Sequence, residues 1–162
     1  MLNLFVTTGT QFPFDRLLQP IENWAENNKK VKVVAQTCAS KLTFKNIDAH
    51  EFLSPENYKS IIKNSDVIIG HAGMGTIITA HEHGLPVIIM ARRFSLDEHR
   101  NDHQMATISK FRETTGVYVA EDENGLLEIL NNIEQLSPCT NTPPKSRNEL
   151  TDFLKSEILH KC

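Results

Sequence analysis

Two short runs, Asp66–Ile69 and Val87–Met90, are almost entirely apolar and lie on either side of a helical pattern at Met74–His83. A strand without polar alternation must be covered on both faces, as strands are in a parallel sheet flanked by helices. Gly84, which follows the helical pattern, is the residue favoured for a left-handed helix cap. This segment therefore predicts a strand–helix–strand unit of a parallel sheet.

The same alternation continues along the rest of the chain. Further strands are predicted at Leu2–Thr7, Val31–Gln36, Glu51–Leu53 and Val117–Ala120. Further helices are predicted at Phe14–Asn27, Pro55–Lys63, Asn101–Phe111 and Asn124–Leu136. Because crossovers between parallel strands are right-handed, we predict an α/β fold with a Rossmann-like, doubly wound parallel sheet.

The chain of 162 residues is long enough for one domain with its own core. We predict this domain over residues 1–136, a Pro-rich linker over 137–146 and an amphipathic helix over 147–162. Apolar residues recur at helical spacing in the last segment, at Leu150, Phe153, Leu154 and Ile158. That helix either packs back on the sheet, which we favour, or lies on a partner chain.

Charge and cysteine content exclude several classes of protein. The net charge is -3 and Lys and Arg are scattered, so nucleic acid is not expected as a partner. The apolar runs are far too short to span a bilayer, and Leu2 begins a strand rather than a signal peptide. Cys38, Cys139 and Cys162 are odd in number and widely separated, so we expect neither a disulfide framework nor a zinc knuckle. A cytoplasmic location is expected.

Three polar loops follow the predicted strands at their carboxyl ends. They are Thr7–Gln11, which includes Thr8, Gly9 and Thr10; Gly70–Thr76; and Ala91–Gln104. In doubly wound sheets ligands bind outside the carboxyl ends of the strands. These loops carry more hydrogen-bonding groups than packing alone requires, so we expect the ligand there.

The glycine-rich turn before the helix at Met74–His83 is a candidate anion site. Gly73 and Gly75 allow a close approach to the backbone, Thr76 adds a hydroxyl, and the helix N-terminus favours negative charge. The alternative is a tight turn without a ligand. The pattern is not the dinucleotide fingerprint, because Ile78 stands where its third glycine would be.

The polar cluster after the next strand suits carbohydrate, because carboxylate and amide groups bind neighbouring hydroxyls. It consists of Asn101, Asp102, His103 and Gln104. The alternative is a solvated helix N-terminus capped by Asn101 or Asp102. His99 and His103 are four residues apart, a spacing that can hold a metal ion, but no third ligand stands at a diagnostic spacing. No metal site is predicted.

Three further residues each have two possible roles, one in ligand binding and one in structure or at the surface. His71 directly follows a strand and either donates to a phosphate or sugar oxygen or is a structural hydrogen-bonding residue. Arg92 and Arg93 either neutralise a diphosphate or are surface charge. Of the two arginines, we assign Arg93 to the ligand.

These motifs, taken together, resemble those of a known family. They are Phe5–Gln11 with Pro13–Leu17, Gly70–Thr76, Gly84–Pro86 and Glu98–Gln104. The chain resembles the glycosyltransferase family 28 C-terminal domain over roughly residues 2 to 135. Within it, the chain resembles stand-alone Alg13-like proteins, including bacterial PssE- and EpsE-like exopolysaccharide subunits.

The resemblance implies the donor-binding half of a GT-B enzyme that holds a UDP-sugar. It implies that Gly73, Met74, Gly75 and Thr76 meet the diphosphate, that Asp102 and Gln104 contact the sugar, and that Thr8–Gln11 lines the cleft. Asn101 and His103 would complete the sugar contacts. Many relatives carry an acid that binds the ribose on the helix after the glycine turn, where this chain has Thr79. The implied catalytic groups are His71 and His99, acting as an acid or a hydrogen-bond donor.

We therefore read the chain as the donor-binding subunit of a two-component glycosyltransferase in polysaccharide synthesis. It would transfer a hexose or N-acetylhexosamine to a lipid-linked acceptor, without a cofactor. A membrane-anchored Alg14-like subunit would supply the acceptor face and hold the chain at the inner face of the membrane. Self-association is left open. The alternatives are an NAD-type oxidoreductase module and a non-catalytic nucleotide-sugar-binding regulatory subunit; Gln36-Thr37, where the first would need an acid, counts against it.

Overall fold

The computed structural model describes residues 1–140. Most of the predicted linker and the whole of the predicted helix at 147–162 lie outside the described residues, so the domain boundaries stay predictions.

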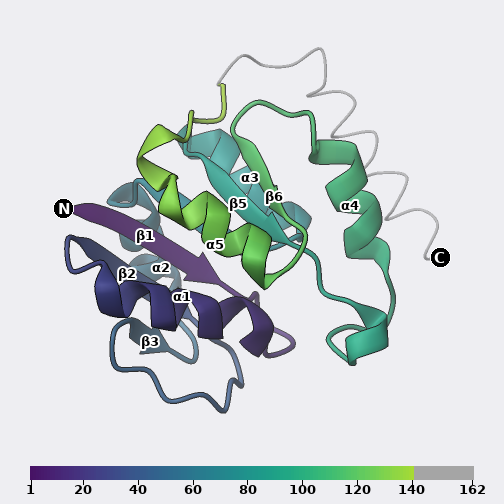
Figure 1. Ribbon diagram of the computed structural model, residues 1–162, viewed down its shortest axis with the longest axis horizontal. Coiled ribbons are helices and arrows are strands. Elements are labelled where there is room, and N and C mark those ends of the chain that lie inside the picture. The colour runs from purple at the N-terminus through teal and green to yellow at the C-terminus, as the bar shows by residue number, and fades with distance from the viewer. Residues whose placement is uncertain (141–162) are drawn as a thin grey trace.

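The described residues form one sheet of six strands, all parallel, with helices on both faces (Figure 1). The strands are β1 (Leu2–Thr7), β2 (Val31–Gln36), β3 (Asp48–His50), β4 (Val67–His71), β5 (Val87–Met90) and β6 (Val117–Ala120). Their order across the sheet is β3-β2-β1-β4-β5-β6. The α/β, Rossmann-like fold predicted from the sequence is confirmed.

Helices cover the two faces in separate groups. The helices are α1 (Asp15–Asn27), α2 (Pro55–Lys63), α3 (Met74–His83), α4 (His103–Phe111) and α5 (Glu123–Asn131). One core contains Leu18 of α1 and Leu126 of α5, and the other contains Ile62 of α2, Ile77 of α3 and Ile108 of α4. The sheet is therefore buried between two helical layers.

The apolar composition of β4 and β5 follows from this double cover. In β5, Ile88 packs in the core of α1 and α5, and Ile89 packs in the core of α2, α3 and α4; both are 0% exposed. Successive side chains of a strand point to opposite faces, so every position of such a strand has to be apolar.

The order of the strands reverses between β1 and β4, which pair directly, with Thr7 opposite Gly70. The chain runs outward from β1 to β3 and then returns to the other side of β1. In doubly wound sheets the crevice at such a point, beyond the carboxyl ends of the strands, is where ligands bind.

Some predicted boundaries are corrected by the structure. The third strand is Asp48–His50 rather than Glu51–Leu53, because its pairing with β2 ends where Gln36 meets His50. Beyond that point the Gln36 side chain accepts a hydrogen bond from the Leu53 N–H, which holds this segment as a loop.

Three helices are also shorter than the pattern predicted, and α1 begins at Asp15 rather than Phe14 because Phe14 is its N-cap. Helix α4 begins at His103 rather than Asn101, because the Asn101 side chain accepts from the His103 N–H and forms a turn. Helix α5 ends at Asn131, and a separate 3₁₀ turn follows at Ile133–Gln135. A second 3₁₀ turn, η1 (Phe94–Leu96), follows β5 and was not predicted.

Gly116→Ala should destabilise the fold by roughly 2–4 kcal/mol, because the residue has φ +84° and a Cβ would lie 2.3 Å from the backbone nitrogen of Cys139. Gly125→Ala in α5 is the matched control, since its Cβ would lie 3.6 Å from Asp122 Oδ1, an ordinary contact. That variant should be neutral or stabilised by about 0.5–1 kcal/mol. Urea unfolding measures both, and equal stabilities would contradict the assigned strain.

Candidate functional site

A cavity of about 70 Å³ opens at the carboxyl ends of the central strands. Its lining comes from residues 8–12 of the loop after β1, from His71 at the end of β4, and from Arg92, His99 and Gln104 after β5. It lies beside the point where the strand order reverses. The sequence-predicted residues Thr8–Gln11, His71, His99 and Gln104 are therefore brought together.

The His71 ring lies between the two glycine-bearing loops. A Cβ on Gly9 would be 2.9 Å from Cε1 of His71, and one on Gly73 would be 2.3 Å from its Nε2. A Cβ at either position would require this ring to shift, and Gly9 also has a positive φ of 81°. His71 thus joins the loop after β1 to the turn before α3.

Burial controls the charge of His71. Desolvation is the main cause that lowers the pKa of His71 to about 4. The positive charge of Arg92 and the neighbouring His99 act in the same direction, and the backbone of Thr7 opposes the shift. The imidazole is therefore neutral at physiological pH and offers one N–H donor and one acceptor nitrogen. Within residues 1–140, the buried Nδ1 atoms of His71 and His99 have no hydrogen-bond partner.

The turn before α3 presents backbone donors. Gly73 caps the helix without a side-chain hydrogen bond, so the N–H groups of the first turn, at Met74, Gly75 and Thr76, are not capped by a side chain. A Cβ on Gly75 would have nothing within 4 Å, so this position faces open space. The Thr76 side chain is buried at 5% exposure. The arrangement is the one that binds anions at helix N-termini.

Gln104 has a fixed orientation in the cavity wall. It is 7% exposed, and its Oε1 accepts from the backbone N–H of Arg92 at 3.0 Å. The two hydrogens on Nε2 are left to donate. Arg92 is 2% exposed, and burial lowers its pKa to about 10, so it stays charged at neutral pH.

The other predicted residues of the polar cluster shape the loop. Asp102 accepts from the Phe94 N–H at 3.0 Å, and Asn101 accepts from the His103 N–H at 3.2 Å. Neither these residues nor His103 lines the cavity. Their part in ligand binding stays a prediction.

Arg93 and Thr79 also lie outside the cavity lining. The Arg93 guanidinium donates to the carbonyl of Glu121 at 2.8 Å, and Thr79 donates to the Gly75 carbonyl within α3 at 2.8 Å. The sequence favoured Arg93 over Arg92, but the structure places Arg92 in the cavity wall. Adjacent side chains after a strand point in different directions, so the path of the loop decides which of the two arginines faces the cavity.

Phe12 is a further residue of the cavity that the sequence analysis missed. Its ring packs edge-on against His99 with centroids 5.8 Å apart, and the Arg100 guanidinium lies 5.7 Å from its centre. Its place in the motif between Gly9 and Phe14 was the available signal.

In the described residues, no group of three His, Cys, Asp or Glu side chains could hold a metal ion. No helix among residues 1–140 is long and apolar enough to cross a membrane.

Several solved structures that are similar to this chain are GT-B glycosyltransferases. The ALG13 solution structure has a TM-score of 0.61 at 20% identity, over 92% of this chain and 94% of that one. MurG of Acinetobacter baumannii has a TM-score of 0.57 at 15% identity, and Os79 of O. sativa in complex with UDP has 0.56 at 19%. The alignments cover 82% and 83% of this chain but only 41% and 33% of those two.

The profile of the glycosyltransferase family 28 C-terminal domain matches residues 3–156, so the chain belongs to that family. It is a glycosyltransferase domain, as its sequence motifs implied. No match was found among curated proteins.

His71 should make folding stability depend on pH. Its pKa is about 4 in the folded protein and 6.5 when exposed, so the unfolded chain binds more protons between these values. Stability contributed by neutral His71 is thus complete above pH 6.5 and is lost as the pH falls toward 4, by up to about 3 kcal/mol. The loss should be smaller in His71→Asn, measured by urea unfolding from pH 7 to 4; parallel curves would contradict the assignment.

Proposed function

We propose that this chain is the donor-binding subunit of a two-component glycosyltransferase that takes a UDP-sugar and transfers its hexose or N-acetylhexosamine to a lipid-linked acceptor of polysaccharide synthesis. The observation that carries the proposal is the meeting of two glycine-bearing loops around His71, where the strand order reverses. Uncapped helix donors lie on one side of that ring and hydroxyl, amide and imidazole groups on the other.

The diphosphate would bind at the first turn of α3. Its backbone donors and the helix dipole both favour negative charge. Gly75 leaves the approach to this turn open. Negative charge that develops on the departing diphosphate would be stabilised by these fixed donors, which need no reorganisation during the reaction.

The sugar would bind in the cavity. The Nε2 of Gln104 donates to hydroxyl oxygens, and Thr8 and Thr10 lie in the same wall. His71 and His99 would act on the leaving oxygen as hydrogen-bond donors. The pKa of about 4 at His71 favours that role over storage of a proton before the donor binds. The general base would come from the acceptor subunit.

Exposed apolar side chains support the existence of a partner. In residues 1–140 the large exposed ones are Met1, Phe52, Phe94, Leu96 and Met105. All but Met1 follow the carboxyl ends of strands, after β3 or β5, at the edge where the cavity opens. This apolar rim (Phe52, Phe94, Leu96 and Met105) suits a second subunit that completes the cleft. We propose a membrane-anchored, Alg14-like acceptor subunit in that place.

The end of β2 disfavours the dinucleotide alternative. NAD-binding domains need an acid there for the ribose, but this chain has Gln36. Its amide is already used, with Nε2 donating to the Gly9 carbonyl at 3.0 Å and Oε1 accepting from the Leu53 N–H at 3.1 Å. Thermal protection by UDP but not by NAD would support the proposed function, because a ligand of the native state raises the melting temperature.

Gly75→Val should weaken UDP binding by at least about tenfold, because its side chain would enter the space where the proposal puts the diphosphate. Calorimetric titration with UDP measures this. Gly125→Val, also in a first helical turn, is the control and should bind UDP normally. Unchanged affinity in a folded Gly75→Val variant would refute the phosphate assignment.

Phe94→Ser with Leu96→Ser should weaken assembly with the acceptor subunit while UDP binding is retained, because both side chains are half-exposed at 56% and 51% and are not in the cavity lining. Co-purification with a co-expressed membrane-anchored acceptor protein measures assembly. Sugar transfer should require that partner. Full assembly by the double variant would exclude this surface, and a complex that binds UDP-sugar but never transfers would favour a regulatory subunit.

A further inference from the structure

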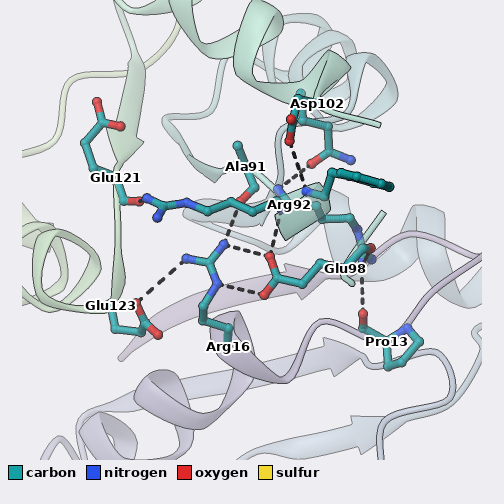
Figure 2. Close-up of polar contacts among 11 residues, drawn as sticks. Pro13, Arg16, Ala91, Arg92, Glu98, Asp102, Glu121 and Glu123 are labelled. Atoms are coloured by element: carbon teal, nitrogen blue, oxygen red, sulfur yellow. Dashed lines mark hydrogen bonds and ion pairs between the residues drawn. The ribbon is translucent and has the colours of Figure 1, made fainter. Parts of the chain in front are cut away.

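Arg92 ties the loop after β1 to the end of β5 (Figure 2). Its guanidinium donates to the carbonyls of Pro13 and Phe12, both at 2.6 Å, and also to that of Thr8. The Glu98 carbonyl accepts from the same group at 3.3 Å. The rigid fork of donors in a guanidinium can satisfy several carbonyls at once. One side chain therefore fixes the path of the loop that forms one wall of the cavity.

Arg16 makes the reciprocal connection, from α1 to the loop after β5 (Figure 2). Its Nε donates to Oε1 of Glu98 at 2.7 Å, and its Nη2 donates to Oε2 at 2.9 Å and to the Ala91 carbonyl at 2.8 Å. The same Glu98 carboxylate accepts from the Arg93 N–H at 2.9 Å. Paired, charge-assisted bonds of this kind fix geometry as well as adding energy.

Phe14 connects the two arginines. Its ring is 1% exposed and lies 5.3 Å from the Arg16 guanidinium and 4.7 Å from that of Arg92. Both cations use one buried aromatic ring, so a shift of either alters the packing of the other. Phe14 therefore packs against both side chains that join the loop after β1 and α1 to the end of β5.

The contacts of Arg16 and Arg92 lead to two groups of the proposed sugar site, His99 and Gln104. His99 directly follows Glu98, and the N–H of Arg92 orients the amide of Gln104 at 3.0 Å. In the described part of the chain, no hydrogen bond or ion pair joins Arg16 or Arg92 to the first turn of α3. The hydrogen bonds of Arg16 and Arg92 therefore reach the proposed sugar side of the site and not the first turn of α3.

We propose that Arg16 is a positioning residue: through Glu98 it sets the places of His99 and Gln104, and so the affinity for the sugar of the donor but not for its diphosphate. This rests on the proposed function. Arg16 and Glu98 side chains are 12% and 13% exposed, so substitution leaves them access to water. Arg92 is less suitable for a test, because its loss would leave several buried carbonyls unpaired.

The test compares Arg16→Gln with the control Arg112→Gln, which removes the half-exposed ion pair with Glu121 away from the cavity lining. Affinities for UDP, UDP-glucose, UDP-galactose and UDP-N-acetylglucosamine are measured by calorimetry on the full chain. Arg16→Gln should weaken the preferred UDP-sugar by about tenfold, the scale of a slight misplacement of binding groups. UDP affinity should change less than about twofold. Glu98→Gln should act in the same direction.

A second measurement needs no ligand. Amide hydrogen exchange of residues 93–102 in the free protein should accelerate in Arg16→Gln and not in Arg112→Gln, while amides of β4 and β5 stay protected. Unchanged exchange, equal losses for UDP and UDP-sugar, or the same losses in Arg112→Gln would each overturn the positioning role. If the unsubstituted chain binds neither UDP nor any UDP-sugar, the proposed function is overturned, and exchange alone decides whether Arg16 positions the loop.

Discussion

The pairing of β1 with β4 is the constraint on which the candidate site depends. Thr7 lies opposite Gly70 at the ends of these strands, and a Cβ on Gly70 would lie 2.9 Å from the Thr7 carbonyl oxygen and from Thr76 Cγ2. Glycine at that position therefore lets the two strand ends and the first turn of α3 pack together. Because the strand order reverses between β1 and β4, the loops that leave them diverge to opposite sides and open a crevice.

His71 occupies the centre of that crevice at a cost in solvation. The ring contacts both glycine-bearing loops, and burial keeps it neutral, with an unpaired Nδ1. Buried polar atoms without partners are uncommon in folded proteins, and they concentrate where a ligand or a reaction later uses them. In the proposed function, a neutral donor between the turn before α3 and the polar cavity would suit the oxygen that joins a sugar to a diphosphate.

Sequence patterns predicted the bounds of elements whose ends are set by neighbouring residues in the chain. The elements Pro55–Lys63 and Val87–Met90 were placed with the observed bounds, since a proline at a helix start and an unbroken apolar run are local signals. The third strand was misplaced because an edge strand carries a weak pattern and ends where β2 ends. The sequence analysis chose Arg93, whereas Arg92 lines the cavity, because its position depends on carbonyl groups of residues 8–13, some eighty positions earlier in the chain.

The two halves of the proposed site, for the diphosphate and for the sugar, are therefore built from different groups: backbone donors in one and side chains in the other. In the proposed function, backbone donors at the first turn of α3 bind the diphosphate, and Gly75 leaves their approach open. The proposed sugar contacts are instead side chains, and a network of hydrogen bonds among α1, the end of β5 and the loop before α4 surrounds them. Donor specificity can then diverge among related chains by changes in that network, without loss of nucleotide binding. In the proposed complex, the apolar rim would contact the separate acceptor subunit.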